Sequence, residues 1–214
     1  MVDQYISRSQ WEDIVGDGSY YSYDNFRRAA ARERESGFLR VGGTNERKRE
    51  LAAFLANCAH ETGNFYHITE VNRSGQPYGR YYGRGPIQLT WDFNYGAFSE
   101  HYYGNRSTLL NDPDRVSEDG EVGFASAIWF WMTQPNSNKC AHTNIYRSTC
   151  SHSNWGFGRT IMAINGDLEG GAVEGGSREK DKQVTSRIRY YRRFADKLGT
   201  SVGNNGEQLD THGM

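Results

Sequence analysis

Apolar residues recur at helical spacing in residues 46–61, within a segment that is also rich in alanine. The positions that share one face are Leu51, Phe54, Leu55 and Cys58. This pattern predicts a buried helix, because a period of 3.6 residues places such positions on one side. Thr44 or Asn45 is a candidate cap for its start, and Gly63 with Asn64 is expected to end it.

Three further segments show the same periodicity. Residues 24–36 predict a helix that stops at Gly37, and residues 1–20 predict a short helix that docks on the core. Residues 186–199 belong to a helix near the end of the chain, whose apolar stripe comprises Val184, Ile188, Tyr191, Ala195 and Leu198. The polar residues 200–214 are expected to form a partly frayed tail. These elements indicate a mainly α-helical protein.

A different pattern follows the first of these helices. Apolar and polar side chains alternate over residues 65–69, which predicts a strand that leads to Glu70. A second strand-like stretch contains Gln88, Thr90 and Asn94. At even spacing these three side chains would share one face. We therefore expect a small β element that points polar side chains into one cleft.

Two carboxylates stand out in this region. Glu61 and Glu70 are nine residues apart, so they are not an i,i+4 helical pair and should lie on different elements. Glu61 would project from a buried helix end, where burial and the helix dipole both disfavour its charged form. Glu70 would lie in a polar setting that keeps it ionised. This difference suits a general acid and a general base for cleavage of a glycosidic bond.

The same two residues also have an ordinary interpretation. Most isolated carboxylates are solvated, so Glu61 could be a helix-end surface charge and Glu70 a charge at a strand edge. Spacing and composition alone favour the ordinary interpretation.

Longer motifs narrow the choice. The segments HETG, TEVN and YYGRGPIQLTWDFNYG closely resemble the signature of glycoside hydrolase family 19, the chitinases of plants and some bacteria. Residues 124–133, 156–170 and 186–199 resemble the tryptophan-rich helix, the GFG–ING segment and the closing helix of that family. The resemblance runs in the family's order from about residue 46 to residue 205. It implies the two-lobed fold of the lysozyme-like superfamily, with a small β element beside the cleft.

The resemblance also implies roles for particular residues. Glu61 matches the general acid, Glu70 the general base, and Thr90 the hydroxyl residue that helps to hold the attacking water. The matching substrate-binding residues are His60, Thr62, Tyr81, Gln88, Asn94, Lys139, Asn165 and Arg187. A hydroxyl such as that of Thr90 can both donate and accept hydrogen bonds, which is enough to orient a water molecule.

Arg187 has two interpretations. Its guanidinium is permanently charged, and near Glu70 it would keep that carboxylate ionised. Its position beside the apolar stripe of its helix fits a role at the edge of the cleft. The residues alone, without the family resemblance, favour a solvated helix charge or a structural salt bridge.

The chain departs from the family at two places. Asn64 stands where many members have a second glycine, and the connection between Glu70 and the YYGRGP run is very short. A loop with a sugar-stacking tryptophan in plant enzymes has no counterpart. We therefore expect few outer sugar-binding subsites and an open cleft.

Size and charge limit the alternatives. A chain of 214 residues predicts a single domain over residues 1–214, and a net charge of −1 argues against a nucleic-acid partner. No apolar run reaches the length of a membrane span. A polymer-degrading enzyme is normally secreted, although the N-terminus lacks the hydrophobic region of a signal peptide. We expect a monomer without a cofactor.

Three cysteines leave several possibilities. Cys58 lies on an apolar helix face and should be a buried thiol. Cys140 and Cys150 could close a short loop as a disulfide in an extracellular protein. With His142 and His152 they could also form a zinc site, but the C-x-H spacing departs from the usual ligand patterns. The third alternative is that both are reduced surface thiols.

The sequence therefore predicts an enzyme, an endo-acting chitinase that inverts the anomeric centre. An inverting pair should have its carboxyl groups roughly 6.5–9.5 Å apart. Two alternatives remain. One is an endolysin that applies the same chemistry to peptidoglycan, and the other is a chitin-binding protein without catalysis. The presence of both carboxylates and of Thr90 and Asn165 argues against the second.

Overall fold

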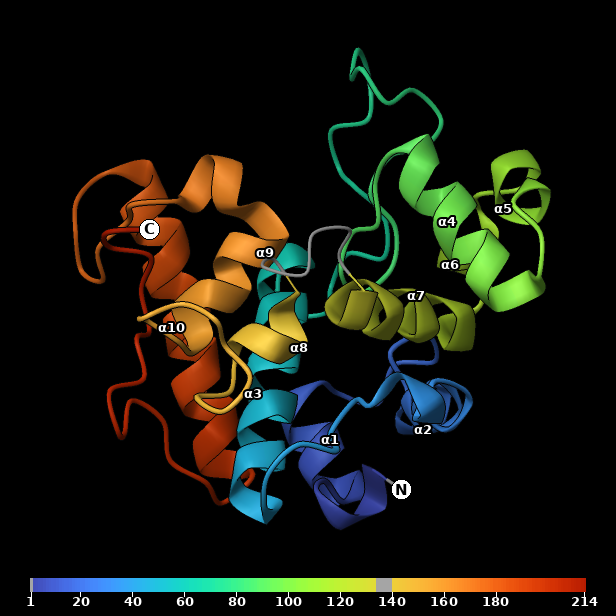
Figure 1. Ribbon diagram of the computed structural model, residues 1–214. Helices are drawn as coiled ribbons and strands as arrows, with labels where there is room; N and C mark the ends of the chain where they lie inside the picture. Colours follow the sequence, from blue (N-terminus) through green and yellow to red (C-terminus); the bar gives the residue numbers. More distant parts are fainter. Residues whose placement is uncertain (1, 134–139) are drawn as a thin grey trace.

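The computed structural model describes residues 2–133 and 140–214. Ten α-helices and two 3-10 helices make up almost all regular structure in these ranges (Figure 1). The α-helices are α1 (Arg8–Ile14), α2 (Tyr23–Arg32), α3 (Thr44–Glu61), α4 (Asp92–Tyr103), α5 (Ser107–Asn111), α6 (Arg115–Glu118), α7 (Gly120–Thr133), α8 (Ala141–Asn144), α9 (Phe157–Glu169) and α10 (Glu179–Lys197). The 3-10 helices are η1 (Val2–Gln4) and η2 (Arg34–Ser36).

The helices form two lobes. In one lobe α10 packs along α3, and α9 contacts both helices and α8 (Figure 1). In the other lobe α4 packs on α5, while α7 contacts α2, α4, α6 and α8 and so lies between the lobes. The expected mainly α-helical, two-lobed architecture is confirmed. The expected β element is reduced to two isolated antiparallel bridges, Thr69 with Arg84 and Arg84 with Leu89.

Helix α3 forms the centre of the first lobe. Every residue from 50 to 59 is buried, because four alanines among the larger residues let neighbouring helices approach on all sides. The predicted cap at the start of α3, Thr44 or Asn45, was wrong. Thr44 is already helical, Gly43 is the N-cap, and its backbone N–H donates to the Glu46 carboxylate at 2.7 Å.

The other helix predictions agree with the structure. Helix α2 continues into η2, and Gly37 ends that segment with a left-handed φ of 94°. A short helix, α1, buries Trp11 against Phe26, with ring centroids 4.7 Å apart. The last predicted helix corresponds to α10, which begins before residue 186. Residues 65–69 do not form the expected strand, because Asn64 and Phe65 adopt left-handed φ values of 64° and 62° in a tight turn.

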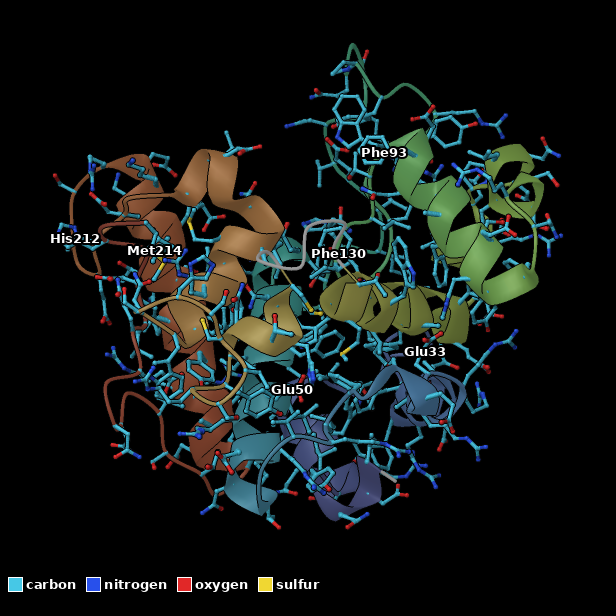
Figure 2. All side chains as sticks on the ribbon, viewed as in Figure 1. Glu33, Glu50, Phe93, Phe130, His212 and Met214 are labelled. Atoms are coloured by element: carbon cyan, nitrogen blue, oxygen red, sulfur yellow. The ribbon has the colours of Figure 1, made fainter. Side chains whose placement is uncertain are left out.

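A buried carboxylate joins four parts of the structure. Glu50 of α3 is completely buried near the middle of the molecule (Figure 2). Its oxygens accept hydrogen bonds from the Leu39 backbone N–H at 2.9 Å and from Trp131 of α7 at 3.0 Å. The Tyr146 hydroxyl contacts it at 2.5 Å, as does a ring nitrogen of His142. Four partners compensate for the burial of this charge, so Glu50 connects α7 and α8 to α3.

The tail is anchored at two buried positions, although most of residues 201–206 are exposed. Thr211 is fully buried, donates to the Glu169 carbonyl at 2.5 Å, and accepts from the Ala172 N–H at 2.8 Å. Glu207 is also buried and accepts a hydrogen bond from Tyr191 of α10 at 2.8 Å. These contacts attach the end of the chain to α9 and α10.

The cysteines are free thiols, so the expected Cys140–Cys150 disulfide is absent from this structure. The Cys140 thiol lies 3.1 Å from the Met132 carbonyl, and the Cys150 thiol lies 3.5 Å from the Asn144 side chain. Within residues 2–133 and 140–214, no group of three or more His, Cys, Asp or Glu side chains is arranged to hold a metal ion. No helix in the described part of the chain combines the length and apolarity that crossing a membrane requires.

Candidate active site

A cleft of about 570 Å³ lies between the two lobes. One wall comes from the end of α3, from α7 and from α9, and the other comes from residues 67–91 and the start of α4. Figure 2 labels Phe130 of α7, which lines the cleft, and Phe93 near the start of α4. The lining residues are Glu61, His67, Thr69, Glu70, Val71, Tyr78, Gly83, Ile87, Gln88, Thr90, Trp91, Asn94, Phe130, Ile164, Asn165 and Leu168. The cleft therefore unites six of the residues that the sequence predicted.

Glu61 is the last residue of α3, and 20% of its side chain is exposed. The helix ends there because three consecutive residues, Gly63, Asn64 and Phe65, have left-handed φ values of about 60°. The Asn64 N–H turns back to the Ala59 carbonyl at 2.6 Å and closes the helix end. This early end leaves the Glu61 carboxylate at the cleft floor rather than within the core.

Arg187 of α10 forms a buried salt bridge with Glu61. Its side chain is completely buried, and its Nη2 donates to Glu61 Oε1 at 2.5 Å. The same guanidinium forms a two-point contact with Glu169, at 2.9 Å from Nε and 2.6 Å from Nη2. A third nitrogen donates to Asn57 of α3 at 3.1 Å. Burial would lower the pKa of Arg187, but Glu61 and Glu169 outweigh it and raise that pKa, so the side chain stays charged.

This arrangement corrects two expectations about Arg187. Its hydrogen bonds go to Glu61, Glu169 and Asn57, so the direct effect on Glu70 that the sequence suggested is not present. Because Arg187 is fully buried, it also cannot contact a substrate directly in this structure. The structural salt bridge, which the sequence left open, is what the fold contains.

Helix α9 supplies Asn165 and Glu169 through a local break. Asn165 has a non-helical φ of −141° and ψ of 34° inside the helix, and its side chain lines the cleft. It donates to Glu169 Oε1 at 2.7 Å. Burial opposes the charge of Glu169, yet the hydrogen bonds and charge of Arg187, with the bond from Asn165, lower its pKa. Glu169 is therefore the ionised partner of Arg187.

Glu70 lies on the opposite wall and is held by the 70–83 segment. Its backbone N–H donates to the Gly83 carbonyl at 2.8 Å, and the Gly83 N–H donates to Glu70 Oε2 at 3.1 Å. The Tyr78 hydroxyl donates to the other oxygen, Oε1. Both carboxylate oxygens thus have a fixed donor, although residues 71–75 nearby are exposed.

Gln88, Thr90 and Asn94 reach the cleft by a route that differs from the predicted strand. Gln88 lies in a turn with φ of 51°, Trp91 has φ of 76°, and Asn94 belongs to α4. The Thr90 hydroxyl donates to the Gln88 carbonyl at 2.8 Å, and the Asn94 side chain donates to the Thr90 carbonyl at 2.9 Å. The three side chains converge through a turn followed by a helix start, so the expectation of a shared strand face was wrong.

Three predicted substrate-binding residues lie away from the cleft lining. Thr62 is fully buried, and its hydroxyl donates to the Cys58 carbonyl and accepts from the Phe65 N–H. The Tyr81 hydroxyl donates to the Leu110 carbonyl at 3.0 Å. Burial, followed by the charge of Arg187, lowers the pKa of His60 to about 4. None of these three residues lines the cleft. The fourth, Lys139, lies outside the described residues.

Several residues at the site were not predicted. Tyr78 and Trp91 stand on the Glu70 side, while Leu168 stands on the α9 side and is 73% exposed. Glu169 was also missed, because a carboxylate in the GDLEG segment has the sequence context of a surface loop. The i,i+4 spacing of Asn165 and Glu169 was the one available signal.

Comparison with known proteins gives a consistent result. The chain matches the family model described as Chitinase class I over residues 1–78 and 64–210. It is 34% identical over 200 residues to Chitinase 4 of Oryza sativa subsp. japonica, covering 87% of this chain and 61% of that protein. It is also 34% identical over 238 residues to Endochitinase CH5B of Phaseolus vulgaris, covering 94% of this chain and 69% of that protein. This chain therefore spans about three fifths to two thirds of the length of these curated relatives.

Solved structures give the same match in three dimensions. Chitinase C from Streptomyces griseus HUT6037 is 33% identical with a TM-score of 0.75, over 96% of this chain and 80% of that one. A bacterial family 19 chitinase is 35% identical with a TM-score of 0.76, over 95% of this chain and 100% of that one. A class IV chitinase from Zea mays is 29% identical with a TM-score of 0.73, over 97% and 99% of the two chains.

Proposed function

Because the chain belongs to the class I chitinase family, glycoside hydrolase family 19, we propose that it hydrolyses chitin, the polymer of β-1,4-linked N-acetylglucosamine. The observation that carries this proposal is the position of Glu61 and Glu70 in one cleft, on walls from different lobes. Several relatives bear the name endochitinase, which supports cleavage within the polymer chain.

The settings of the two carboxylates support different roles. Arg187 occupies Glu61 Oε1, so Oε2 is the oxygen left to carry a proton to the glycosidic oxygen. Arg187 also donates to Glu169, so the buried cation is not paired with Glu61 alone. In this role Glu61 is the general acid, which protonates the leaving sugar as its bond to C1 breaks.

Glu70 and Thr90 would act together on the other side of the sugar. Glu70 accepts a proton from water while the water oxygen forms a bond to C1, and Thr90 orients that water. The attack comes from the face opposite the leaving group, so the product has the α configuration. Gln88, Asn94 and Asn165 line the same cleft and offer amide groups to the sugar hydroxyls and N-acetyl groups.

The charge of the cleft favours chitin over peptidoglycan. In the proposed mechanism Glu61 carries a proton and Glu70 is ionised, and the described lining residues include no lysine or arginine. Peptidoglycan carries a lactyl group on every second sugar, which ends in a carboxylate or a peptide. A free lactyl carboxylate would be repelled there, whereas N-acetylglucosamine is neutral.

We further propose that residues 1–214 form a single catalytic domain that acts as a monomer outside the cell. One continuous core of buried residues, which extends from Tyr5 to Leu198, supports the single domain. The size of polymeric chitin supports the extracellular location.

The direct test is hydrolysis of the hexamer of N-acetylglucosamine, with the anomers of the fresh products resolved. We expect internal cleavage with newly formed α ends. Newly formed β ends would overturn the inverting mechanism. An absence of cleavage, combined with clearing of bacterial wall suspensions, would support the peptidoglycan alternative.

A further inference from the structure

We propose that Tyr78 is a positioning residue, which holds the Glu70 carboxylate in the orientation that activates water. This inference rests on the proposed function, in which Glu70 is the general base. Tyr78 lies in the short connection between Glu70 and the YYGRGP run, outside the motifs on which the family resemblance depends.

The first observation is how Glu70 is bound. The Tyr78 hydroxyl donates to Oε1, and the Gly83 N–H donates to Oε2 at 3.1 Å. A carboxylate with one donor on each oxygen has a fixed plane, yet each oxygen keeps a further lone pair. Glu70 can therefore accept a hydrogen bond from water without losing either support.

The second observation is the contact of the Tyr78 ring. Its centroid lies 5.4 Å from that of Trp91, at an interplanar angle of 80°. This edge-on arrangement is favourable for aromatic pairs. Trp91 follows Thr90 directly, and its backbone N–H donates to the Tyr81 carbonyl at 2.9 Å. Tyr78 thus contacts both Glu70 and the neighbour of Thr90, so it links the two segments that would hold the attacking water.

The third observation is that Tyr78 is suited to act only as a donor. Burial and the hydrogen bond to Glu70 raise the pKa of Tyr78 to about 12. The phenol therefore keeps its proton at neutral pH, and the proton from water passes to Glu70 rather than to Tyr78. A hydrogen bond to a charged acceptor is stronger than a neutral one, so it also stabilises the ionised carboxylate.

An ordinary packing role does not account for these contacts as well. Tyr78 is only half-buried, and most of residues 71–80 are exposed, so the segment has little core to stabilise. Its hydroxyl nevertheless points to Glu70 rather than to solvent.

The test is the variant Tyr78→Phe, which removes the hydroxyl and keeps the ring against Trp91. The matched control is Tyr82→Phe, because the Tyr82 hydroxyl makes only long contacts, 3.3 Å to Arg73 and 3.5 Å to Asp114. We expect Tyr78→Phe to lower kcat by about 10- to 100-fold, since misplacing a reacting group has effects of that order. KM should change by less than about threefold, because the lost bond does not contact substrate.

The pH profile separates positioning from packing. Loss of a donor to an ionised carboxylate should move the acidic limb of the kcat/KM profile to higher pH in Tyr78→Phe. Tyr82→Phe should keep the wild-type profile, and both variants should keep the wild-type unfolding midpoint. A Tyr78→Phe enzyme with wild-type kcat, or with a lower kcat and an unmoved limb, would overturn the inference.

Failure of the proposed function would look different. In that case the wild-type protein would not cleave the hexamer, or Glu70→Gln would leave its activity intact. An active Glu70→Gln variant removes Glu70 as the base and overturns the role of Tyr78 with it, as does a wild-type protein that cleaves neither the hexamer nor peptidoglycan. If the wild-type protein clears bacterial walls without cleaving the hexamer, only the substrate changes, and the same variants are compared on that substrate. If the wild-type protein is active and Glu70→Gln is inactive, the proposed function stands, and the Tyr78→Phe measurements test only the positioning role of Tyr78.

Discussion

Arg187 donates a hydrogen bond from Nη2 to Glu61 Oε1 at 2.5 Å, and the same nitrogen donates to Glu169 Oε1 at 2.6 Å. One buried cation is therefore shared between a carboxylate at the cleft floor and a carboxylate in the core. Glu169 therefore shares the positive charge of Arg187 with Glu61. This relationship connects α3, α9 and α10 at the candidate active site, and the predictions below begin with it.

Replacing Glu61 with Gln should abolish turnover and leave binding of N-acetylglucosamine oligomers largely intact. Glutamine keeps the shape and accepts the bond from Arg187, but it has no proton to transfer. General acid catalysis typically contributes 10²–10⁴-fold, so initial rates with the hexamer should fall by at least about 100-fold. Calorimetric titration would report the affinity. A variant that retains more than about a tenth of the activity would exclude Glu61 as the acid.

Replacing Glu169 with Gln should lower both stability and activity at neutral pH. The change leaves the buried charge of Arg187 with one carboxylate instead of two, and breaking a buried pair typically costs about 3–5 kcal/mol. Arg187 would then hold Glu61 more firmly in its ionised form. The basic limb of the kcat/KM profile should consequently move to lower pH.

Glu174→Gln is the matched control for that experiment. Glu174 pairs with Arg192 at the surface, where half of the Arg192 side chain is exposed. Exposed pairs contribute at most about 1 kcal/mol. Urea unfolding should therefore separate the two variants clearly, and equal destabilisation would contradict the buried role of Glu169.

His60 should make the protein less stable as the pH falls. Its folded pKa is lowered to about 4 from 6.5, so the unfolded chain binds more protons between these values. The contribution of neutral His60 to the free energy of unfolding is therefore fully present above pH 6.5. It is lost as the pH falls toward 4, by up to about 1.4 kcal/mol per pH unit. Glu169 adds a loss at lower pH, below its ordinary value of 4.5.

Unfolding midpoints measured from pH 7 to pH 4 would test this linkage. In the variant His60→Gln the slope between pH 6.5 and pH 4.5 should flatten, while the loss below pH 4.5 should remain. A variant with the full wild-type slope would show that another group is responsible.

Replacing Thr211 with Val should destabilise the protein although the shape is conserved. Valine cannot accept the hydrogen bond from the Ala172 N–H, and it cannot donate one to the Glu169 carbonyl, so both buried groups lose this partner. Each unsatisfied buried group costs about 1–3 kcal/mol. Activity should also fall, because Glu169 shares Arg187 with Glu61. Ser201→Ala, at an exposed position of the same tail, should change the free energy of unfolding by less than about 0.5 kcal/mol.

The sequence by itself determined the helical architecture and the two candidate catalytic carboxylates. The helix over residues 46–61 was visible because apolar periodicity and end signals are local, and Gly63 with Asn64 marked its end correctly. Glu61, Glu70 and Thr90 were recognisable because they stand in motifs with fixed spacing. All three do line one cleft.

Only the tertiary structure decided which side chains meet. Arg187 is 126 residues from Glu61, and no local pattern shows that it faces that carboxylate rather than Glu70. Gln88 and Asn94 converge through positive-φ turns that break strand periodicity. Glu169 and the buried tail residues Glu207 and Thr211 acquire their contacts from packing between separate elements. Hydrogen bonds of this kind depend on where helices cross, and that geometry is a property of the whole fold.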